Sequence, residues 1–491
     1  MILIGANPNG KQVFLNPKMA NRHGLIAGAT GTGKTVTLQV LIENFSRLGV
    51  PVFTADVKGD LSGLAAPAKA HKKIDERINK IGIDGYSAQA CPITFWDVFG
   101  KAGNPVRTTI SEMGPNLLAN LLELNDTQEG VLNIAFDIAD SQGLLLLDIK
   151  DLRAMLNWLA DNRKEIERDY GAVASQSVAA IVRKLLVLEK AGGNTFFGEP
   201  ALRITDLMRC DSDGQGVVNI LDGKKLMMSP RIYATFLLWL LSELFEELEE
   251  VGDPDVPKLV FFFDEAHLLF DNAPKALLER VEQVVRLIRS KGVGVFFVTQ
   301  SPADVPEDVL GQLGNRIQHA LRAFTPKDMK AVKSAAQSFR PNKNLDTVKV
   351  ITELGLGEAL VSTLDERGRP SVVEQTLICP PESQIGPVLQ KTKKLLYAQD
   401  ELAEYYQTGI DRESAYELLT QREEEKARVD KASAKQAAER KSAQKARTPK
   451  KKSSSRRQSA GEAFVKSVTR ALGSSVGRRL ARGILGSLLG R

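Results

Sequence analysis

The residues with the clearest chemistry form a glycine-rich loop near the N-terminus. Residues 28–35 read GATGTGKT, a complete GxxxxGK[ST] pattern, with an apolar run before it and apolar residues at helical spacing after it. Between a strand and a helix, glycines let backbone N–H groups turn inward and approach phosphates at the positive end of the helix. The pattern therefore predicts a nucleoside triphosphate site. The residues expected to bind the nucleotide are Gly28, Ala29, Thr30, Gly31, Thr32, Gly33, Lys34 and Thr35.

Within this loop, the lysine and the last hydroxyl group have separate tasks. Lys34 is expected to contact the β- and γ-phosphates, and the Thr35 hydroxyl is expected to bind Mg²⁺. The alternative is a glycine-rich turn that binds nothing. The strand-like run before the loop and the helical pattern after it favour the nucleotide site.

A second motif places two carboxylates after an apolar run. Asp264 and Glu265 follow LVFFF at 259–263, which is typical of a buried strand. We expect Asp264 to hold Mg²⁺, directly or through water, and Glu265 to orient and deprotonate the attacking water. Strands often end in acidic residues, so this pair gains its meaning from the glycine loop. An activated water also argues against a kinase. The two motifs together predict an ATPase that uses ATP and Mg²⁺.

Gln300 ends a third apolar run, VGVFFVTQ at 293–300. If this strand lies between those of the two motifs, Gln300 can donate a hydrogen bond to the γ-phosphate and sense its loss. The alternative is an exposed polar residue at a strand end.

The segment 275–292 just before that run has the apolar spacing of a helix, which directs Arg286 and Arg289 away from the core. Within one chain the motifs supply Lys34 as their single positive side chain for the γ-phosphate. An exposed arginine here could reach the site of a neighbouring subunit. The alternative is that both arginines are ordinary solvated surface residues.

The order of elements around these motifs is that of an α/β protein. Strand, glycine loop, helix and strand follow one another over residues 23–56, which is the opening of a parallel sheet. Continuous apolar runs, as expected for strands buried on both faces, recur later in the chain. They lie at 216–222, 258–266, 293–300, 315–322 and 357–365.

We therefore predict a RecA-like P-loop ATPase fold with a mainly parallel central sheet, a helical insertion and a helical or disordered basic C-terminal tail. The expected parts are an ATPase core of residues 1–59 and 216–380, a mainly helical insertion at 60–215, a helical extension at 381–420, a basic low-complexity linker at 421–460, and a basic amphipathic helix at 461–491.

The charge is unevenly distributed. Residues 421–491 hold 20 Lys and Arg against 6 Asp and Glu, a net +14, whereas residues 1–420 carry a net −8. A flexible basic segment, with Lys450, Lys451 and Lys452 at its centre, suits contact with phosphates. We therefore expect an acidic body whose tail contacts a polyanion.

The last residues of the tail have apolar side chains that recur about every four positions, interspersed with arginines. This spacing predicts a basic amphipathic helix. Docking to the protein itself or a partner, contact with DNA, and adsorption to an anionic membrane all remain open, with docking favoured by its glycines. The apolar positions are Phe464, Val465, Val468, Leu472, Val476, Leu480, Ile484, Leu485, Leu488 and Leu489.

Composition narrows the class of protein. The three cysteines are far apart and form no CxxC pair, which predicts a reduced, cytoplasmic protein without disulfides or structural zinc. The N-terminus lacks the pattern of a signal peptide, and no apolar run approaches the ~20 residues of a membrane span. We expect a soluble protein without a membrane span.

At these motifs the sequence resembles the HerA–FtsK superfamily of ring-forming ATPases, in its HerA-like helicase branch. GATGTGKT, VFTADVKGDLSGL, FFFDEAHLLF and RSKGVGVFFVTQSPADVPEDVLGQLGNRI follow the family's order over about residues 20–370. The resemblance implies a homo-oligomer, expected to be a hexamer, that acts as a DNA translocase or helicase. It also places Arg289 at the family's arginine finger, and it makes Asp56 a candidate site residue and Asp60 a loop residue.

The sequence also departs from the family. Archaeal members carry a small β-barrel before the glycine loop, and here 22 residues precede the first strand expected. The departure removes a known docking platform and so counts against a partner nuclease. A nuclease or another protein partner stays an open alternative. The DEAH at 264–267 invites comparison with DEAH-box RNA helicases, but the arginine-rich motifs of a second RecA-like domain are absent. His267 is interpreted as a packing residue or as a link from Glu265 to a DNA channel.

Three functions compete. The leading hypothesis is a ring motor acting on DNA without base specificity, because no aromatic-rich basic patch or reader helix is present. The second is a non-DNA motor of the same superfamily, of the kind that powers conjugation or secretion. The third is a switch protein that only binds ATP, which Glu265 argues against.

Overall fold

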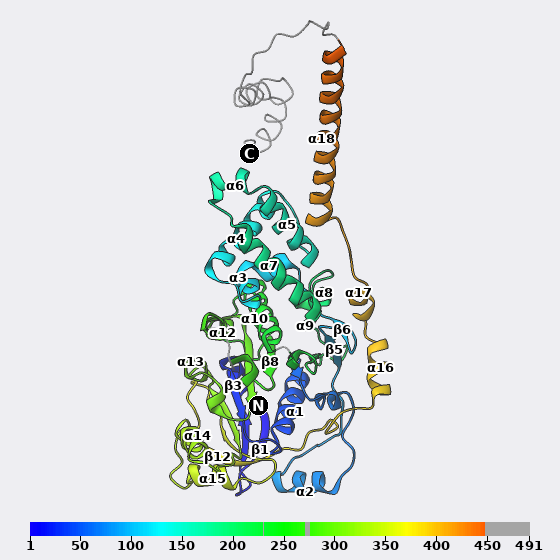
Figure 1. The fold of residues 1–491 in the computed structure, drawn as a ribbon. Coiled ribbons are helices and arrows are strands. Elements are labelled where there is room, and N and C mark those ends of the chain that lie inside the picture. The colour runs from blue at the N-terminus through cyan, green and yellow to red at the C-terminus, as the bar shows by residue number, and fades with distance from the viewer. Residues whose placement is uncertain (229, 271–274, 447–491) are drawn as a thin grey trace. The chain divides into compact units, whose positions relative to one another are not determined.

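The strand before the glycine loop lies near the centre of a twelve-stranded sheet. The computed structural model describes residues 1–228, 230–270 and 275–446 (Figure 1). The strands follow the order β2-β1-β12-β11-β10-β3-β9-β8-β4-β7-β5-β6. They are β1 Ile2–Ala6, β2 Gln12–Leu15, β3 Gly24–Ala27, β4 Val52–Asp56, β5 Ile93–Asp97, β6 Asn104–Pro105, β7 Val218–Asp222, β8 Leu259–Phe263, β9 Val293–Thr299, β10 Asn315–His319, β11 Glu358–Ser362 and β12 Glu374–Ile378.

The sheet has a parallel part and an antiparallel part. From β10 to β6 all neighbouring strands run parallel, whereas β11, β12, β1 and β2 are joined by antiparallel pairing. The expected strands after the glycine loop are present as β4, β7, β8, β9, β10 and β11. The prediction of an α/β fold with a mainly parallel central sheet is confirmed.

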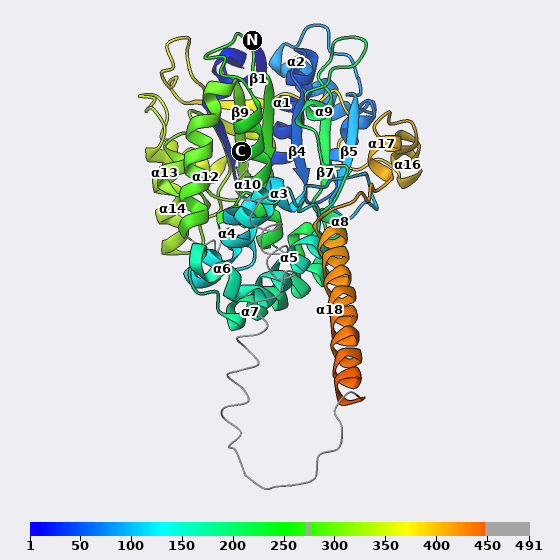
Figure 2. The ribbon, with the colours of Figure 1, turned by 90° about the horizontal axis from the view of Figure 1, so that it is seen from above.

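Helices cover both faces of this sheet, and Figures 1 and 2 show α3 to α7 gathered beyond one end of it. The helices are α1 Lys34–Arg47, α2 Lys72–Ile81, α3 Ile110–Leu121, α4 Asp126–Ser141, α5 Ile149–Asp161, α6 Arg163–Tyr170, α7 Ser175–Leu188, α8 Asn194–Phe196, α9 Ile204–Leu207, α10 Pro230–Glu247, α11 His267–Phe270, α12 Lys275–Ile288, α13 Glu307–Leu310, α14 Pro326–Gln337, α15 Thr347–Glu353, α16 Gln390–Ala398, α17 Ala403–Gln407 and α18 Ala415–Ala446.

Alternate residues of the central strands build two different cores. On β8, Leu259, Phe261 and Phe263 contact the cluster that contains α10 and α12, whereas Val260 and Phe262 contact the cluster that contains α1. All five side chains are buried. Because both faces of the strand are covered, its sequence is a continuous apolar run rather than an alternating one.

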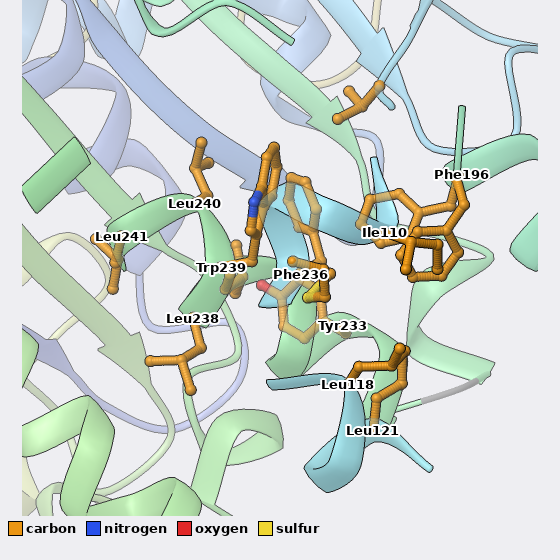
Figure 3. Close-up of a cluster of buried hydrophobic side chains, with 14 of the residues drawn as sticks. Ile110, Leu118, Leu121, Phe196, Tyr233, Phe236, Leu238, Trp239, Leu240 and Leu241 are labelled. Carbon is orange, nitrogen blue, oxygen red and sulfur yellow. The ribbon is translucent and has the colours of Figure 1, made fainter. Parts of the chain in front are cut away.

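The segment 60–215, expected to be mainly helical, contains α2 to α9, but it also contributes β5 and β6 to the sheet. The apolar part of β5 is only Ile93 to Trp96, too short a run to separate a strand from a loop by its pattern. Helices α3 to α9 of this segment share one core with α10, in which Phe196 packs edge-on against Phe236 and Trp239 (Figure 3).

The outer strands of the antiparallel part, β1, β2 and β12, were not predicted from the sequence. β1 and β2 precede the glycine loop, and β1 pairs with β12, so that Gly5 lies opposite Ile378. A Cβ on Gly5 would lie 2.0 Å from the Leu377 carbonyl oxygen, so this pairing requires glycine. Residues 1–22 thus extend the sheet.

The chain divides into two units, Met1–Arg422 and Glu423–Arg491. Where 421–460 was expected to be a low-complexity linker, the described part is helical to Ala446, and residues 421–440 are all exposed. Ala, Glu, Lys and Gln favour helix without burying apolar surface. The expected amphipathic helix at 461–491 lies outside the described residues. Among the helices described, none alone has the length and hydropathy needed to cross a bilayer.

A buried histidine should make the fold sensitive to acid. His23 is 2% exposed, and its Nδ1 accepts a hydrogen bond from the Val295 amide at 3.1 Å. Burial lowers its pKa from 6.5 to about 4. Between these two values the unfolded chain binds the proton more strongly than the folded one, so stability is lost as pH falls through this window.

We predict that His23→Asn, which retains an acceptor near Nδ1, reduces the loss of unfolding free energy between pH 6.5 and pH 4 by roughly 3 kcal/mol. Urea unfolding at a series of pH values measures this loss. His71→Asn is the matched control, because His71 is exposed and also accepts an amide hydrogen bond through Nδ1, from Lys73. An undiminished pH dependence in His23→Asn would contradict the prediction.

Candidate nucleotide-binding site

The glycine loop connects the end of β3 to the first residue of α1, Lys34. Its glycines are required by space as well as by conformation. Gly28 has φ 155°, and a Cβ there would lie 2.5 Å from the Cβ of His319. Gly33 has φ 112°, and its Cβ would lie 3.1 Å from the Cα of Gly357. The loop therefore rests on the ends of β10 and β11, which fix the backbone that surrounds the phosphate position.

Lys34 is buried and turned toward the loop. Its Nζ donates to the carbonyl oxygens of Gly28 at 2.5 Å and Ala29 at 3.2 Å. Burial lowers the pKa of Lys34, and the nearby positive charge of Lys58 lowers it further, while Glu265 and Asp264 oppose the shift. The lysine thus lies within the electrostatic reach of both carboxylates, as the sequence predicted for one shared site.

His319, the last residue of β10, supports the glycine loop. Its Nε2 lies 2.8 Å from the Thr37 hydroxyl and its Nδ1 lies 2.9 Å from the Glu358 carbonyl oxygen. Because a carbonyl can only accept, Nδ1 carries the proton and Nε2 accepts from Thr37. Burial lowers the pKa of His319 to about 4, so it links β10 to α1 as a neutral ring. No motif in the sequence singled out His319.

Asp264 follows β8 directly. Its backbone carbonyl accepts from the Tyr233 hydroxyl of α10 at 3.3 Å, and its Oδ1 accepts from the Glu265 amide at 2.9 Å. Burial raises its pKa to about 6, and the charge of Glu265 adds to the rise. A divalent cation would offset both effects. Asp264 and Thr35 offer carboxylate and hydroxyl oxygens, the donors that Mg²⁺ prefers, so the residues fit this ion.

Glu265 occupies an unusual backbone conformation, with φ 51°, which is rare for a residue other than glycine. Its side chain is buried and has three polar side chains as neighbours. Lys58 Nζ lies 2.6 Å from Oε1, and Gln300 Nε2 and His267 Nδ1 each lie 3.4 Å from Oε2. Burial works to raise the pKa of Glu265, but the hydrogen bond and charge of Lys58 outweigh it and the pKa is lowered.

Gln300 is the first residue after β9, and it is exposed. Because β9 lies between β3 and β8, its side chain projects at the sheet edge where the glycine loop and the acidic pair lie. The structure thus brings Lys34, Asp264, Glu265 and Gln300 to one edge. From the sequence, His267 was interpreted as a packing residue or as a link from Glu265 to a DNA channel. In the structure it is a neighbour of Glu265.

Lys58 is the residue of this edge that the sequence analysis did not single out. The motifs were expected to supply Lys34 as the only positive side chain, and the contact of Lys58 with Glu265 corrects this expectation. No local pattern carried this signal, because the place of Lys58 follows from the pairing of β4 with β8. Asp56, the candidate named there, holds the loop instead, since its carboxylate accepts from the amides of Gly59 at 2.6 Å and Leu61 at 3.1 Å.

Arg289 lies away from this edge. The helix expected at 275–292 ends at Ile288, and Arg289 starts a 3₁₀ turn before β9. Its guanidinium contacts both carboxylate oxygens of Asp253 at 3.2 Å, and Asp253 also accepts from Asn21 at 3.0 Å. Arg286 is exposed on α12.

The comparisons with known proteins agree with this geometry. Residues 2–491 match the family described as "Helicase HerA-like C-terminal". The chain belongs to this family. The resemblance to the HerA–FtsK superfamily is thereby confirmed, and with it the assignment to the P-loop ATPases of HerA type.

One curated relative of this HerA-like protein is "Probable helicase MJ1565" of Methanocaldococcus jannaschii. It is 33% identical over 109 residues, which are 22% of this chain and 20% of the relative. The match therefore spans about a fifth of that protein's length.

Solved structures share the fold at low identity. The bacterial conjugative coupling protein TrwBdeltaN70, in its unbound monoclinic form, is 15% identical with a TM-score of 0.51, over 80% of this chain and 91% of that one. The plasmid coupling protein TrwB in complex with the non-hydrolysable GTP analogue GDPNP is 14% identical with a TM-score of 0.50, over 80% and 92%. This likeness is one of fold.

We predict that Glu265→Gln retains ATP binding but lowers hydrolysis by about 10²–10⁴-fold, because the amide cannot accept the proton of the attacking water. Binding of a fluorescent ATP analogue and release of phosphate measure the two effects separately. A loss of nucleotide affinity equal to the loss of turnover would assign Glu265 to metal or nucleotide binding instead.

Proposed function

We propose that this chain is an ATP-hydrolysing ring motor that translocates along DNA. The observation that carries the proposal is the convergence of Lys34, Asp264, Glu265 and Gln300 at one edge of a parallel sheet, with Glu265 held by three polar neighbours. A binding protein that uses ATP only as a switch needs no positioned base. Efficient activation of water is what a motor that repeats its cycle requires.

In this proposal each residue has one task. The backbone of residues 28–35 and Lys34 bind the phosphates of ATP, and Thr35 and Asp264 hold Mg²⁺, which neutralises charge on the β- and γ-phosphates when bound. Glu265 accepts a proton from the attacking water. Gln300, next to Glu265, responds to the presence of the γ-phosphate.

The position of Arg289 supports a ring. Arg289 precedes β9 and Gln300 follows it, and the strand between them has seven residues. At about 3.3 Å per residue, the two ends lie roughly 23 Å apart. Arg289 therefore cannot reach the γ-phosphate of its own subunit. Its side chain is 40% exposed and paired with Asp253, from which it could pass to the site of a neighbour, as an arginine finger does.

The charge distribution supports DNA as the track. The unit Glu423–Arg491 is rich in lysine and arginine, while the ATPase part of the chain is acidic. Basic side chains that contact phosphates bind DNA without reading its sequence. A second candidate, a non-DNA motor of conjugation or secretion type, is favoured by the fold shared with the coupling protein TrwB.

DNA-stimulated hydrolysis separates the two candidates. We predict that duplex or single-stranded DNA raises the ATPase rate of the full chain. Removal of residues 423–491 should leave basal hydrolysis intact and weaken DNA binding. For duplex DNA, the slope of log affinity against log salt should fall by about 0.9 for every phosphate that the shortened chain no longer neutralises. Hydrolysis that no DNA stimulates would favour the non-DNA motor, and an unchanged salt slope would remove the tail from DNA binding.

A further prediction concerns the shared site. Arg289→Ala should bind ATP normally and hydrolyse it about 10³–10⁵-fold more slowly. Mixing it with Lys34→Ala subunits should restore part of the activity, because some interfaces then combine an intact glycine loop with an intact finger. Arg286→Ala, exposed on α12 one helical turn earlier, is the matched control and should hydrolyse ATP at the wild-type rate. Wild-type turnover by Arg289→Ala, or full activity of a monomer, would contradict the ring.

A further inference from the structure

The contact between Lys58 and Glu265 joins a second cation to the proposed base. Lys58 Nζ lies 2.6 Å from Glu265 Oε1, and the Lys58 side chain is 45% exposed, whereas that of Glu265 is 7% exposed. The ammonium group has three N–H donors, and this bond uses one. The lysine side chain is half exposed while its partner is buried, so two of its donors are left for a further contact.

The backbone that carries Lys58 is fixed in advance. β4 and β8 are parallel neighbours, with Ala55 opposite Phe263, so the residues after each strand emerge side by side. Asp56 accepts hydrogen bonds from two amides of the following loop. Gly59 has φ 85°, a backbone conformation that favours glycine. The Asp56 bonds and this turn shape the loop that brings Lys58 to the acidic pair.

The charges around this edge indicate what Lys58 contacts besides Glu265. Lys58 lies close enough to Lys34 to lower the pKa of that lysine. Two ammonium groups at one edge repel each other, and Glu265 and Asp264, which lie near both, offset part of this repulsion. Lys34 belongs to the phosphate loop, and Lys58 stands beside the residue expected to face the attacking water. The γ-phosphoryl group of ATP is an anion that both could contact.

We propose that Lys58 is a second catalytic cation supplied by the same subunit, which contacts the γ-phosphoryl oxygens of ATP while it holds Glu265 beside the attacking water. This inference rests on the proposed ATPase function. As the water oxygen bonds to the γ-phosphorus, the bond from that phosphorus to the β–γ bridging oxygen breaks, and ADP leaves with the electron pair. Glu265 takes the proton of the water. Lys58 keeps its own proton and neutralises charge on the transferred group.

Lys58→Met removes the charge and keeps the length of the side chain. We expect kcat to fall by about 10²–10³-fold, the loss seen when one donor to a developing charge is removed. Lys58→Arg, which keeps the charge, should recover part of this loss. Lys224→Met is the matched control, because Lys224 lies against the same loop at Gly59 and has no bond to Glu265 among the contacts described. Thermal unfolding of each variant checks that it is folded.

A second measurement separates contact with the γ-phosphate from a purely structural role. Affinities are compared for ADP and for a non-hydrolysable ATP analogue with an imido bridge. If Lys58 contacts the γ-phosphoryl group, Lys58→Met weakens the analogue by about tenfold and leaves ADP unchanged. A lysine that only neutralises Glu265 would change both affinities equally or neither, and that outcome overturns the proposal.

Chemical rescue gives a third readout. In Lys58→Ala, added ethylammonium should restore part of the hydrolysis rate at a saturating ATP concentration, and the same salt should not affect Lys224→Ala. Unchanged kcat in Lys58→Met also overturns the inference. These failures differ from failure of the proposed function, in which the wild-type protein itself hydrolyses no ATP.

Discussion

The site depends on the parallel pairing of β3, β9, β8 and β4. In parallel strands all carboxyl ends meet at one edge, and this pairing places the glycine loop, Gln300, the acidic pair and the Lys58 loop in a row. Gly24 pairs with Phe296, and Leu259 pairs with Val293, so the three strands are also fixed lengthwise. Because alternate side chains are buried in two different cores, a shift by one residue would exchange them between the two faces. The geometry of the chemistry is therefore set by the packing of apolar residues that take no part in it.

The same edge concentrates charge where water is partly excluded. Asp264 and Glu265 are neighbours in the chain, and burial raises the pKa of Asp264 to about 6. The hydrogen bond and the charge of Lys58 lower the pKa of Glu265 instead. The two carboxylates thus differ through their neighbours. One stands beside a protein cation, and the other has a charge that a metal ion would compensate. The positive φ of Glu265 turns its side chain toward Lys58 and Gln300, and such strain persists only where surrounding contacts over-determine it.

Much of this arrangement could be predicted because its signals are local. GATGTGKT, the apolar run before Asp264 and the run before Gln300 each encode a strand and its functional end without reference to distant residues. β1 and β2 form a local hairpin over residues 2–15, which was overlooked. The place of β12 could not be recognised from a local signal, since its pairing with β1 joins residues at opposite ends of the ATPase part of the chain. Lys58 and His319 were missed for a related reason. Their roles follow from strand order, with β4 beside β8 and β10 beside β3, and strand order is not written in the spacing of any one motif.

Arg289 and Lys58 differ in how exposed their ion pairs are, and this difference fits different roles for the two cations in the proposed motor. Arg289 and Asp253 are 40% and 39% exposed, and an ion pair at that exposure contributes at most about 1 kcal/mol. In the proposed ring, Arg289 would exchange Asp253 for an anion of a neighbouring subunit at little cost, as a residue that engages and releases in every cycle must do. Lys58 contacts a buried carboxylate from a loop fixed by Asp56, so it belongs to the site permanently. In the proposed motor, Lys58 prepares each site for hydrolysis from within its own subunit. Arg289 makes hydrolysis in one subunit depend on its neighbour.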